Sequence, residues 1–232
     1  EGETCRRLSA AARAHGIYVC SGLVERADEG IYNSAVVIDR GGEVILTHRK
    51  IHELVIGHPY YGQGDRLGVC RTDLGTLGLM ICADGFAFGQ VLSRSLCYMG
   101  ADVIVSPSAW AVPADYDPVK TPYGDLWRES YMPVARDFGV WIMSTSCVGW
   151  MERGPWGGRP CIGCSMVVGP EGQEVLQGPY GQDAETILYV DVAPVERPAR
   201  GCGWIDHWKQ TGTGTWGRDE ERRWKGRTSS SS

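Results

Sequence analysis

Short apolar runs bounded by turn residues recur along the chain, and this pattern limits its possible folds more than any other feature. Each run is about four to eight residues long, which is typical of buried strands and too short for a buried helix. The predicted strands span residues 17–24, 33–39, 43–47, 77–81, 101–106 and 140–144. Helical spacing of apolar residues predicts helices at 3–15, 88–99 and 122–137. Strands that alternate with helices predict a mixed β-sheet covered by helices, an α/β fold.

Two turns carry the signals of β-hairpins and insert antiparallel pairs into this order. The first, at residues 40–42, contains two glycines, and the second, at 169–172, contains a Gly-Pro step. The strands that flank the second turn are predicted at 165–168 and 174–176. Pro133 lies inside the third predicted helix, where we expect a kink or an early end because proline lacks the N–H that continues a helix.

Length and composition indicate one globular domain followed by a segment of different character. The chain has 232 residues, of which 43% are hydrophobic and 22% charged, so it can bury a sizeable core of its own. We expect the domain to span residues 1–194. After Pro194 the sequence becomes rich in Arg, Gly, Trp and Ser, which predicts an extended arm and flexible tail at 195–232.

Charge and targeting signals narrow the possible partners. A net charge of −5 does not provide the basic field that a nucleic-acid partner requires. No apolar run approaches the ~20 residues that cross a bilayer. Residues 1–7 do not lead from a basic stretch into an apolar one, as a secretory signal would. We therefore expect a cytoplasmic protein with no nucleic-acid or membrane partner.

Nine cysteines, an odd number, suit a reducing compartment better than a disulfide framework. Most are expected to be small buried side chains. Cys161 and Cys164 form a lone CxxC, and a structural zinc would need a second pair of ligands at matching spacing, which the sequence lacks. We expect neither a metal nor an organic cofactor, and a zinc or redox role for this pair remains an alternative.

Cys82 stands at the end of a predicted buried strand, before a turn that leads into the helix at 88–99. A thiol at such a turn is exposed near a helix N-terminus, where the helix dipole and backbone N–H groups favour a thiolate and can hold an oxyanion. The same position also suits a buried structural cysteine. The pattern around Cys82 alone does not decide between a nucleophile and a structural residue.

Four segments decide this question by their resemblance to a known family. They are residues 32–39, 48–52, 78–84 and 100–108. In order and spacing they resemble the nitrilase superfamily, and the similarity continues to Val192. The distance from Lys50 to Cys82 along the chain resembles that of the aliphatic-amidase branch. The resemblance implies an α-β-β-α sandwich that assembles into homo-oligomers.

The resemblance also implies roles for individual residues. Cys82 corresponds to the nucleophile and Lys50 to the family's lysine, with the Ala83 backbone N–H as a second donor to the oxyanion. A fixed ammonium lowers the pKa of a nearby thiol and stabilises the tetrahedral oxyanion, which is worth about 10²–10³ in rate for one such donor. The alternative is that Lys50 is a solvated lysine in a basic stretch.

The chain departs from the family pattern at two glutamates. The general-base glutamate belongs to a segment for which this chain has no counterpart, so we expect a chain that lacks its first strand and helix and is catalytically inactive as given. The second glutamate corresponds in spacing to His58, which either helps to position substrate or water or is a surface-loop residue. Glu53 is the nearest carboxylate that could substitute for a missing glutamate.

These residues predict a hydrolase that cleaves a non-peptide carbon–nitrogen bond through a cysteine thioester. The expected substrate is a small amide, carbamoyl compound or nitrile. We expect it to bind near the loop after Ser106, where Trp110 either forms a wall of the site or packs in the core. The competing function is a non-catalytic scaffold or sensor that keeps the sandwich and has lost turnover.

Overall fold

A computed structural model describes residues 2–196 of the chain. Residues 1–198 form one compact unit. The arm and tail predicted at 195–232 therefore lie, beyond Glu196, outside the described residues.

The first sheet and its covering helix come from the N-terminal part of the chain. Helix α1 (Glu3–His15) ends at Gly16, whose φ of 62° is the left-handed conformation that glycine adopts readily at a helix end. Strands β1 (Val19–Ala27), β2 (Gly30–Ile38) and β3 (Val44–Arg49) follow, and each pairs antiparallel with the next. The predicted helix at 3–15 and the first predicted hairpin are confirmed.

The second sheet has six strands in the order β11-β10-β7-β6-β5-β4. They are β4 (Val69–Thr72), β5 (Gly75–Leu79), β6 (Val103–Ser108), β7 (Trp141–Ser146), β10 (Met166–Val168) and β11 (Glu174–Gln177). The three central strands are parallel, and the outer ones are antiparallel to their neighbours. This is the mixed sheet that the alternation predicts. A separate hairpin is formed by β8 (Val148–Met151) and β9 (Arg159–Ile162).

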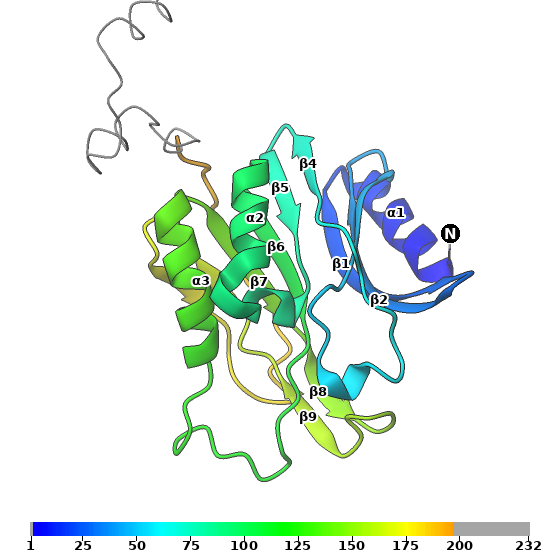
Figure 1. Ribbon diagram of the computed structural model, residues 1–232, viewed down its shortest axis with the longest axis vertical. Helices are drawn as coiled ribbons and strands as arrows, with labels where there is room; N and C mark the ends of the chain where they lie inside the picture. Colours follow the sequence, from blue (N-terminus) through cyan, green and yellow to red (C-terminus); the bar gives the residue numbers. More distant parts are fainter. Residues whose placement is uncertain (1, 197–232) are drawn as a thin grey trace, which may run out of the picture. The chain divides into compact units, whose positions relative to one another are not determined.

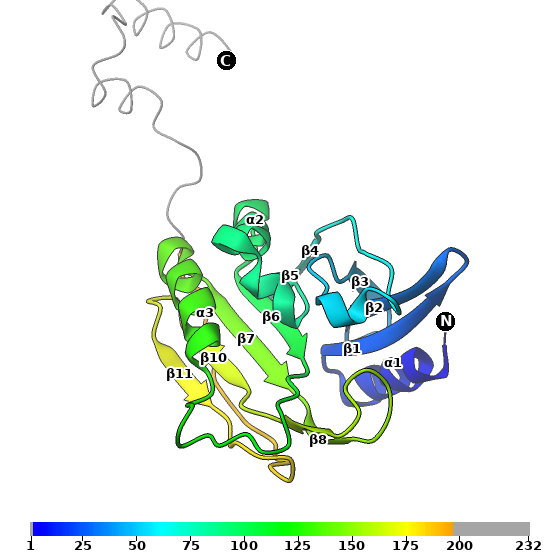
Figure 2. The same ribbon diagram turned by 60° about the horizontal axis from the view of Figure 1, so that its bottom comes forward.

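The two sheets face each other, and helices cover their outer faces (Figures 1 and 2). Helix α1 lies on the first sheet, whereas α2 (Val91–Met99) and α3 (Asp125–Phe138) lie side by side on the second. The described residues thus form the α-β-β-α sandwich that the family resemblance implies. None of the helices within residues 2–196 combines the length and apolar character that crossing a membrane requires.

The core lies between the sheets and continues under the helices. On β2, Ala35 and Val37 belong to the large cluster that contains Leu79 and Ile104 of the second sheet. The alternate residues of β2 pack instead with Ala12 of α1. Because successive side chains of a strand point to opposite faces, β2 is buried on both sides and holds the first sheet between two layers.

Helix α3 does not end at Pro133, contrary to one of the two outcomes expected there. The helix continues to Phe138, and the C-cap Gly139 has a φ of 63°. Tyr131, Val134 and Ala135, on both sides of the proline, are fully buried. Their packing on the sheet stabilises the helix, which offsets the one hydrogen bond that the proline cannot donate.

The connection from β5 to α2 also differs from the prediction. Residues Cys82–Phe86 form a short 3-10 helix, Phe88–Gln90 form another, and α2 begins only at Val91. Gly89 has a φ of 65° and Gln90 a φ of 52°, so the backbone turns sharply before α2. Cys82 therefore begins a 3-10 turn and is not at the N-terminus of an α-helix.

The Asp84 carboxylate in this turn joins the two sheets. Its Oδ1 accepts hydrogen bonds from the backbone N–H groups of Ile51 and His52, at 3.0 and 2.7 Å. Its Oδ2 accepts the Ile81 N–H at 2.9 Å and lies 2.8 Å from His48 Nε2. Both Asp84 and His48 are almost completely buried. Burial alone would raise the pKa of Asp84, but the bonds from His48, His52 and Ile81 bring the pKa below its usual value.

We predict that Asp84→Asn lowers the free energy of unfolding by about 3 kcal/mol or more, because a buried amide presents N–H groups where the fold needs acceptors. The loss should depend on pH. A carboxyl whose pKa is lower in the folded protein contributes stability above about pH 4, its unfolded value, and loses it as the pH falls through the lower folded pKa. Urea unfolding from pH 3 to 7 measures this difference.

Asp73→Asn is the matched control, because Asp73 is more than half exposed and its ion pair with Arg40 is on the surface. We expect this change to cost less than about 1 kcal/mol. Equal urea midpoints for the Asp84 and Asp73 variants would contradict the role given to Asp84.

Candidate active site

The backbone of Cys82 is held in a conformation that non-glycine residues rarely adopt. Its φ is 46°, in the left-handed region, where a side chain costs about 1–2 kcal/mol. The Cys82 N–H donates to Ser106 Oγ at 3.1 Å, and Ser106 is buried near the end of β6. Ser106, which the sequence placed near the substrate, thus fixes the backbone of the cysteine. Such strain, held in place by surrounding contacts, is typical of functional sites.

The Cys82 thiol is protonated at neutral pH. Burial raises the pKa of this thiol, and the Lys50 ammonium, the Ala109 carbonyl region, Ser108 and the Ala83 N–H only partly oppose the effect. Its Sγ lies 3.9 Å from the Ala109 carbonyl oxygen. The expectation that an α-helix N-terminus favours a resting thiolate here is therefore wrong. Nucleophilic attack requires a group that accepts the thiol proton.

Lys50 is positioned by a buried ion pair. It directly follows β3, and its N–H donates to the Asn33 carbonyl at 2.8 Å, which extends the pairing of β2 and β3. Its Nζ lies 2.9 Å from Glu53 Oε1, and the two side chains are only 5% and 7% exposed. These values exclude the alternative of a solvated surface lysine.

The Glu53 carboxylate is itself held by three donors. Oε1 accepts the Lys50 ammonium and the Leu54 N–H, both at 2.9 Å, and Oε2 accepts Asn33 Nδ2 at 3.2 Å. A Cβ at Gly57 would lie 2.9 Å from the Glu53 carboxyl carbon, closer than van der Waals contact allows. Gly57 therefore leaves the space that the carboxylate occupies. The role of Asn33 was not foreseen, because its position in a strand gives no sign of a polar partner.

Cys82, Lys50 and Glu53 line one cavity of about 680 Å³. Its walls come from β1, from the segment after β3, from the loop after β6 and from the β8–β9 hairpin. Cys147, a second free cysteine, also lines it and is exposed. The structure thus brings together the two residues predicted to carry the chemistry and the carboxylate named as a substitute.

Two other candidates do not line this cavity. His58 is exposed, and its Nε2 contacts the Glu53 carbonyl oxygen at 3.3 Å, on the backbone side of the carboxylate. Trp110 lies in an aromatic cluster with ring centroids 5.8 Å from Phe86 and Trp127. Its placement matches core packing, the second of the two roles considered for it.

The CxxC pair has no metal-site geometry around it. Cys161 and Cys164 are both buried free thiols. No three His, Cys, Asp or Glu side chains within residues 2–196 come together as a group that could hold a metal ion. Chemistry at the cavity rests on the groups already described.

Together these groups can perform acyl chemistry. A protonated thiol, a carboxylate able to accept a proton and an ammonium beside them supply a nucleophile, a base and a charge that stabilises an oxyanion. The Ala83 N–H, at the fully buried residue that follows the nucleophile, is directed at the sulfur and supports the same anion.

Comparison with known proteins agrees with this chemistry. The family model described as "Carbon-nitrogen hydrolase" matches residues 1–199. A nitrilase from Pyrococcus abyssi is 38% identical over 194 residues, which cover 83% of this chain and 66% of that protein. An aliphatic nitrilase from Rhodococcus rhodochrous is 26% identical and covers 81% of this chain and 51% of that protein.

Solved structures share the fold. A carbon-nitrogen hydrolase from Helicobacter pylori superposes with a TM-score of 0.69 at 25% identity, over 78% of this chain and 64% of that one. An amidase from Nesterenkonia sp. AN1 superposes with a TM-score of 0.62 at 24% identity, over 76% and 64%.

The chain spans about two thirds or less of the length of these relatives. The match nevertheless includes both sheets, the Cys82 turn and the Lys50 segment, because it runs without interruption through residues 1–199. This chain belongs to the carbon-nitrogen hydrolase family, within the nitrilase superfamily.

Proposed function

We propose that this protein hydrolyses a non-peptide carbon–nitrogen bond of a small amide, carbamoyl compound or nitrile through a thioester on Cys82. The observation that carries the proposal is that the Cys82 thiol and the Lys50 ammonium line one cavity, with Glu53 bound to the lysine. The proposal adds the reaction type and its residues to the family membership.

For an amide, the first step forms a bond between Cys82 Sγ and the carbonyl carbon. The thiol proton passes to Glu53, the one carboxylate of residues 2–196 that lines the cavity. The oxyanion is stabilised by Lys50 and the Ala83 N–H. Collapse breaks the carbon–nitrogen bond, the nitrogen leaves with the proton from Glu53, and water then hydrolyses the thioester to the acid and the free thiol.

A non-catalytic scaffold or sensor is the competing function. The buried Lys50–Glu53 pair argues against it, because two desolvated charges beside a strained cysteine cost stability and have no evident use in a purely structural protein. Assembly into a homo-oligomer and a cytoplasmic location are further parts of the proposal, suggested by the family resemblance and by the sequence.

We predict that fluoroacetamide labels Cys82, the carbon–sulfur bond forming as the carbon–fluorine bond breaks. Amidase from Nesterenkonia sp. AN1 carries the acetamide moiety of fluoroacetamide at its active-site cysteine, which makes this a suitable probe. Because burial raises the pKa of Cys82, the labelling rate should rise with pH, with a midpoint above about 8.5, the usual value of a free thiol. Peptide mapping by mass spectrometry at each pH measures it.

Cys147→Ser is the control for this labelling, since Cys147 is exposed and lines the same cavity. It should leave the adduct at Cys82 in place. If the adduct in the native chain were on Cys147 and Cys82 stayed unmodified, the assignment of the nucleophile would be wrong.

We predict that Lys50→Ala moves the labelling midpoint to still higher pH, because it removes the charge that lowers the thiol pKa. It should also slow acylation by an amide by about 10²–10³. Lys50→Arg should restore neither, since the planar guanidinium does not fit the place of a compact ammonium next to Glu53. Circular dichroism confirms the fold, and an alanine variant with unchanged acylation would remove Lys50 from the mechanism.

We predict that the 232-residue chain acylates faster than it deacylates, so that the acyl-enzyme accumulates. Three donors already occupy most of the lone pairs of Glu53, which makes it a poor base for activating water. Intact mass spectrometry after mixing with a small amide should show the acyl adduct within one turnover. Repeated turnover with no adduct would show that Glu53 or another residue of this chain activates water efficiently.

A further inference from the structure

The β8–β9 hairpin forms a fixed wall of the cavity. Met151, the last residue of β8, pairs with Arg159, and the connecting loop is closed by a hydrogen bond of 2.8 Å from the Gly158 N–H to the Met151 carbonyl. The hairpin is also tied to the loop after β6, since the Val112 N–H donates to the Pro160 carbonyl at 3.1 Å. Loop residues 153–156 therefore have a defined position at the cavity.

Arg153, in this loop, lines the cavity without any partner for its charge. It makes no ion pair and no hydrogen bond with any side chain in the described part of the chain, including its exposed neighbour Glu152. The other charged groups of the cavity, Lys50 and Glu53, neutralise each other at 2.9 Å. The cavity thus has an excess of one positive charge, located on the hairpin.

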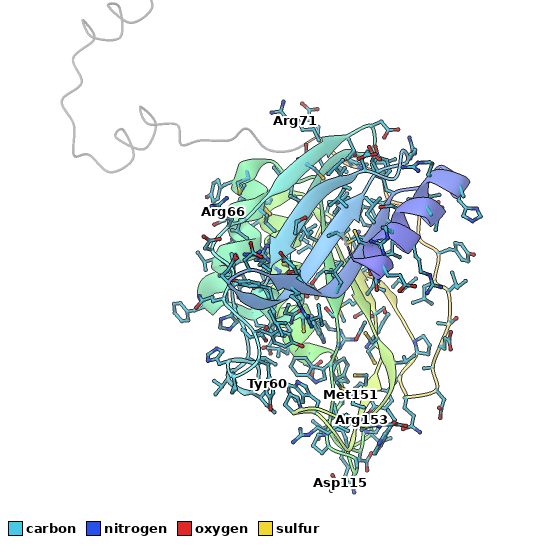
Figure 3. The ribbon with its side chains drawn as sticks, turned by 90° about the vertical axis from the view of Figure 1, so that its right-hand side faces the viewer. Tyr60, Arg66, Arg71, Asp115, Met151 and Arg153 are labelled. Atoms are coloured by element: carbon cyan, nitrogen blue, oxygen red, sulfur yellow. The ribbon has the colours of Figure 1, made fainter. Side chains whose placement is uncertain are left out.

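The surface between the reacting groups and Arg153 is largely apolar. Leu54 and Ile56 line the cavity near Glu53, and Met151 and Trp156 line it on the hairpin. Figure 3 shows Met151 and Arg153 at the same end of the molecule. A volume of about 680 Å³ exceeds what a one- or two-carbon amide would fill. This arrangement suits a substrate with an amide at one end, a short methylene chain and a negative charge at the other.

We propose that Arg153 is a specificity-determining residue that binds a substrate carboxylate while the amide is at Cys82. The substrate class is then the monoamide of a short dicarboxylic acid. The guanidinium favours a carboxylate because its planar fork can donate two parallel N–H bonds to the two oxygens. This inference rests on the proposed function, since it names the substrate of that same site.

Binding can be tested without turnover in a Cys82→Ala background. Glutaramate and pentanamide have the same number of carbons and differ in whether the far end is a carboxylate or a methyl group. Calorimetry should show tighter binding of glutaramate, and adding Arg153→Gln should lower the affinity ratio of glutaramate to pentanamide about tenfold. Arg153→Glu should reverse the preference towards the cationic 5-aminopentanamide.

Arg159→Gln is the matched control, because Arg159 is a cation of the same hairpin that lies over the Trp156 ring, at 5.6 Å, and does not line the cavity. It should leave the affinity ratio unchanged. An equal fall of the ratio in the Arg159 variant, an unchanged ratio in Arg153→Gln, or no binding of either amide would overturn the inference.

Acylation of the native chain separates this inference from the proposed function. If the binding preference depends on Arg153 but neither amide acylates Cys82, the inference is supported and the proposed reaction is wrong. If both amides acylate Cys82 at equal rates and bind equally well, the reaction is supported and the role of Arg153 is wrong.

Discussion

The geometry of the site depends on the Asp84 carboxylate. Lys50 follows a strand of the first sheet, whereas Cys82 follows a strand of the second. Asp84 receives two N–H groups from the segment just after Lys50 and one from the residue just before Cys82. The ammonium and the thiol are thus held at one cavity by four hydrogen bonds to a single buried side chain. A small shift between the sheets would otherwise separate them, and loss of about 1 Å in such placement costs much of the rate.

The nucleophile is held in an unfavourable state by this framework. Its backbone has a φ of 46°, and burial raises the pKa of its thiol. Both features oppose folding and neutral-pH ionisation, so the surrounding contacts must supply the compensating free energy. The Ser106 hydroxyl and the Lys50 charge act on the two problems separately, the first on the backbone and the second on the sulfur. A thiol that ionises only as it attacks is shielded from adventitious reaction in the resting protein.

The sequence was sufficient to predict the sandwich and the two central residues, because both depend on local patterns and ordered motifs. The hairpins at β2–β3 and β10–β11 follow from turn residues that act over a few positions. The 3-10 turn before α2 was not predicted, since helical spacing does not distinguish it from the first turn of an α-helix. The role of Asp84 as a link between sheets involves partners 32 to 36 positions away, and no spacing rule reveals contacts over that distance.

The choice between Glu53 and His58 illustrates the same limit more sharply. Spacing directed attention to His58, yet its imidazole is exposed and reaches only the Glu53 carbonyl oxygen. Glu53 is three residues beyond Lys50, and its carboxylate is at the ammonium because Gly57 has no side chain in that space. A residue with a Cβ at 57 would displace the carboxylate, so positions 53 and 57 are coupled through packing. The buried negative charge beside the lysine is therefore determined by a pair of positions, one that supplies the carboxylate and one that leaves room for it.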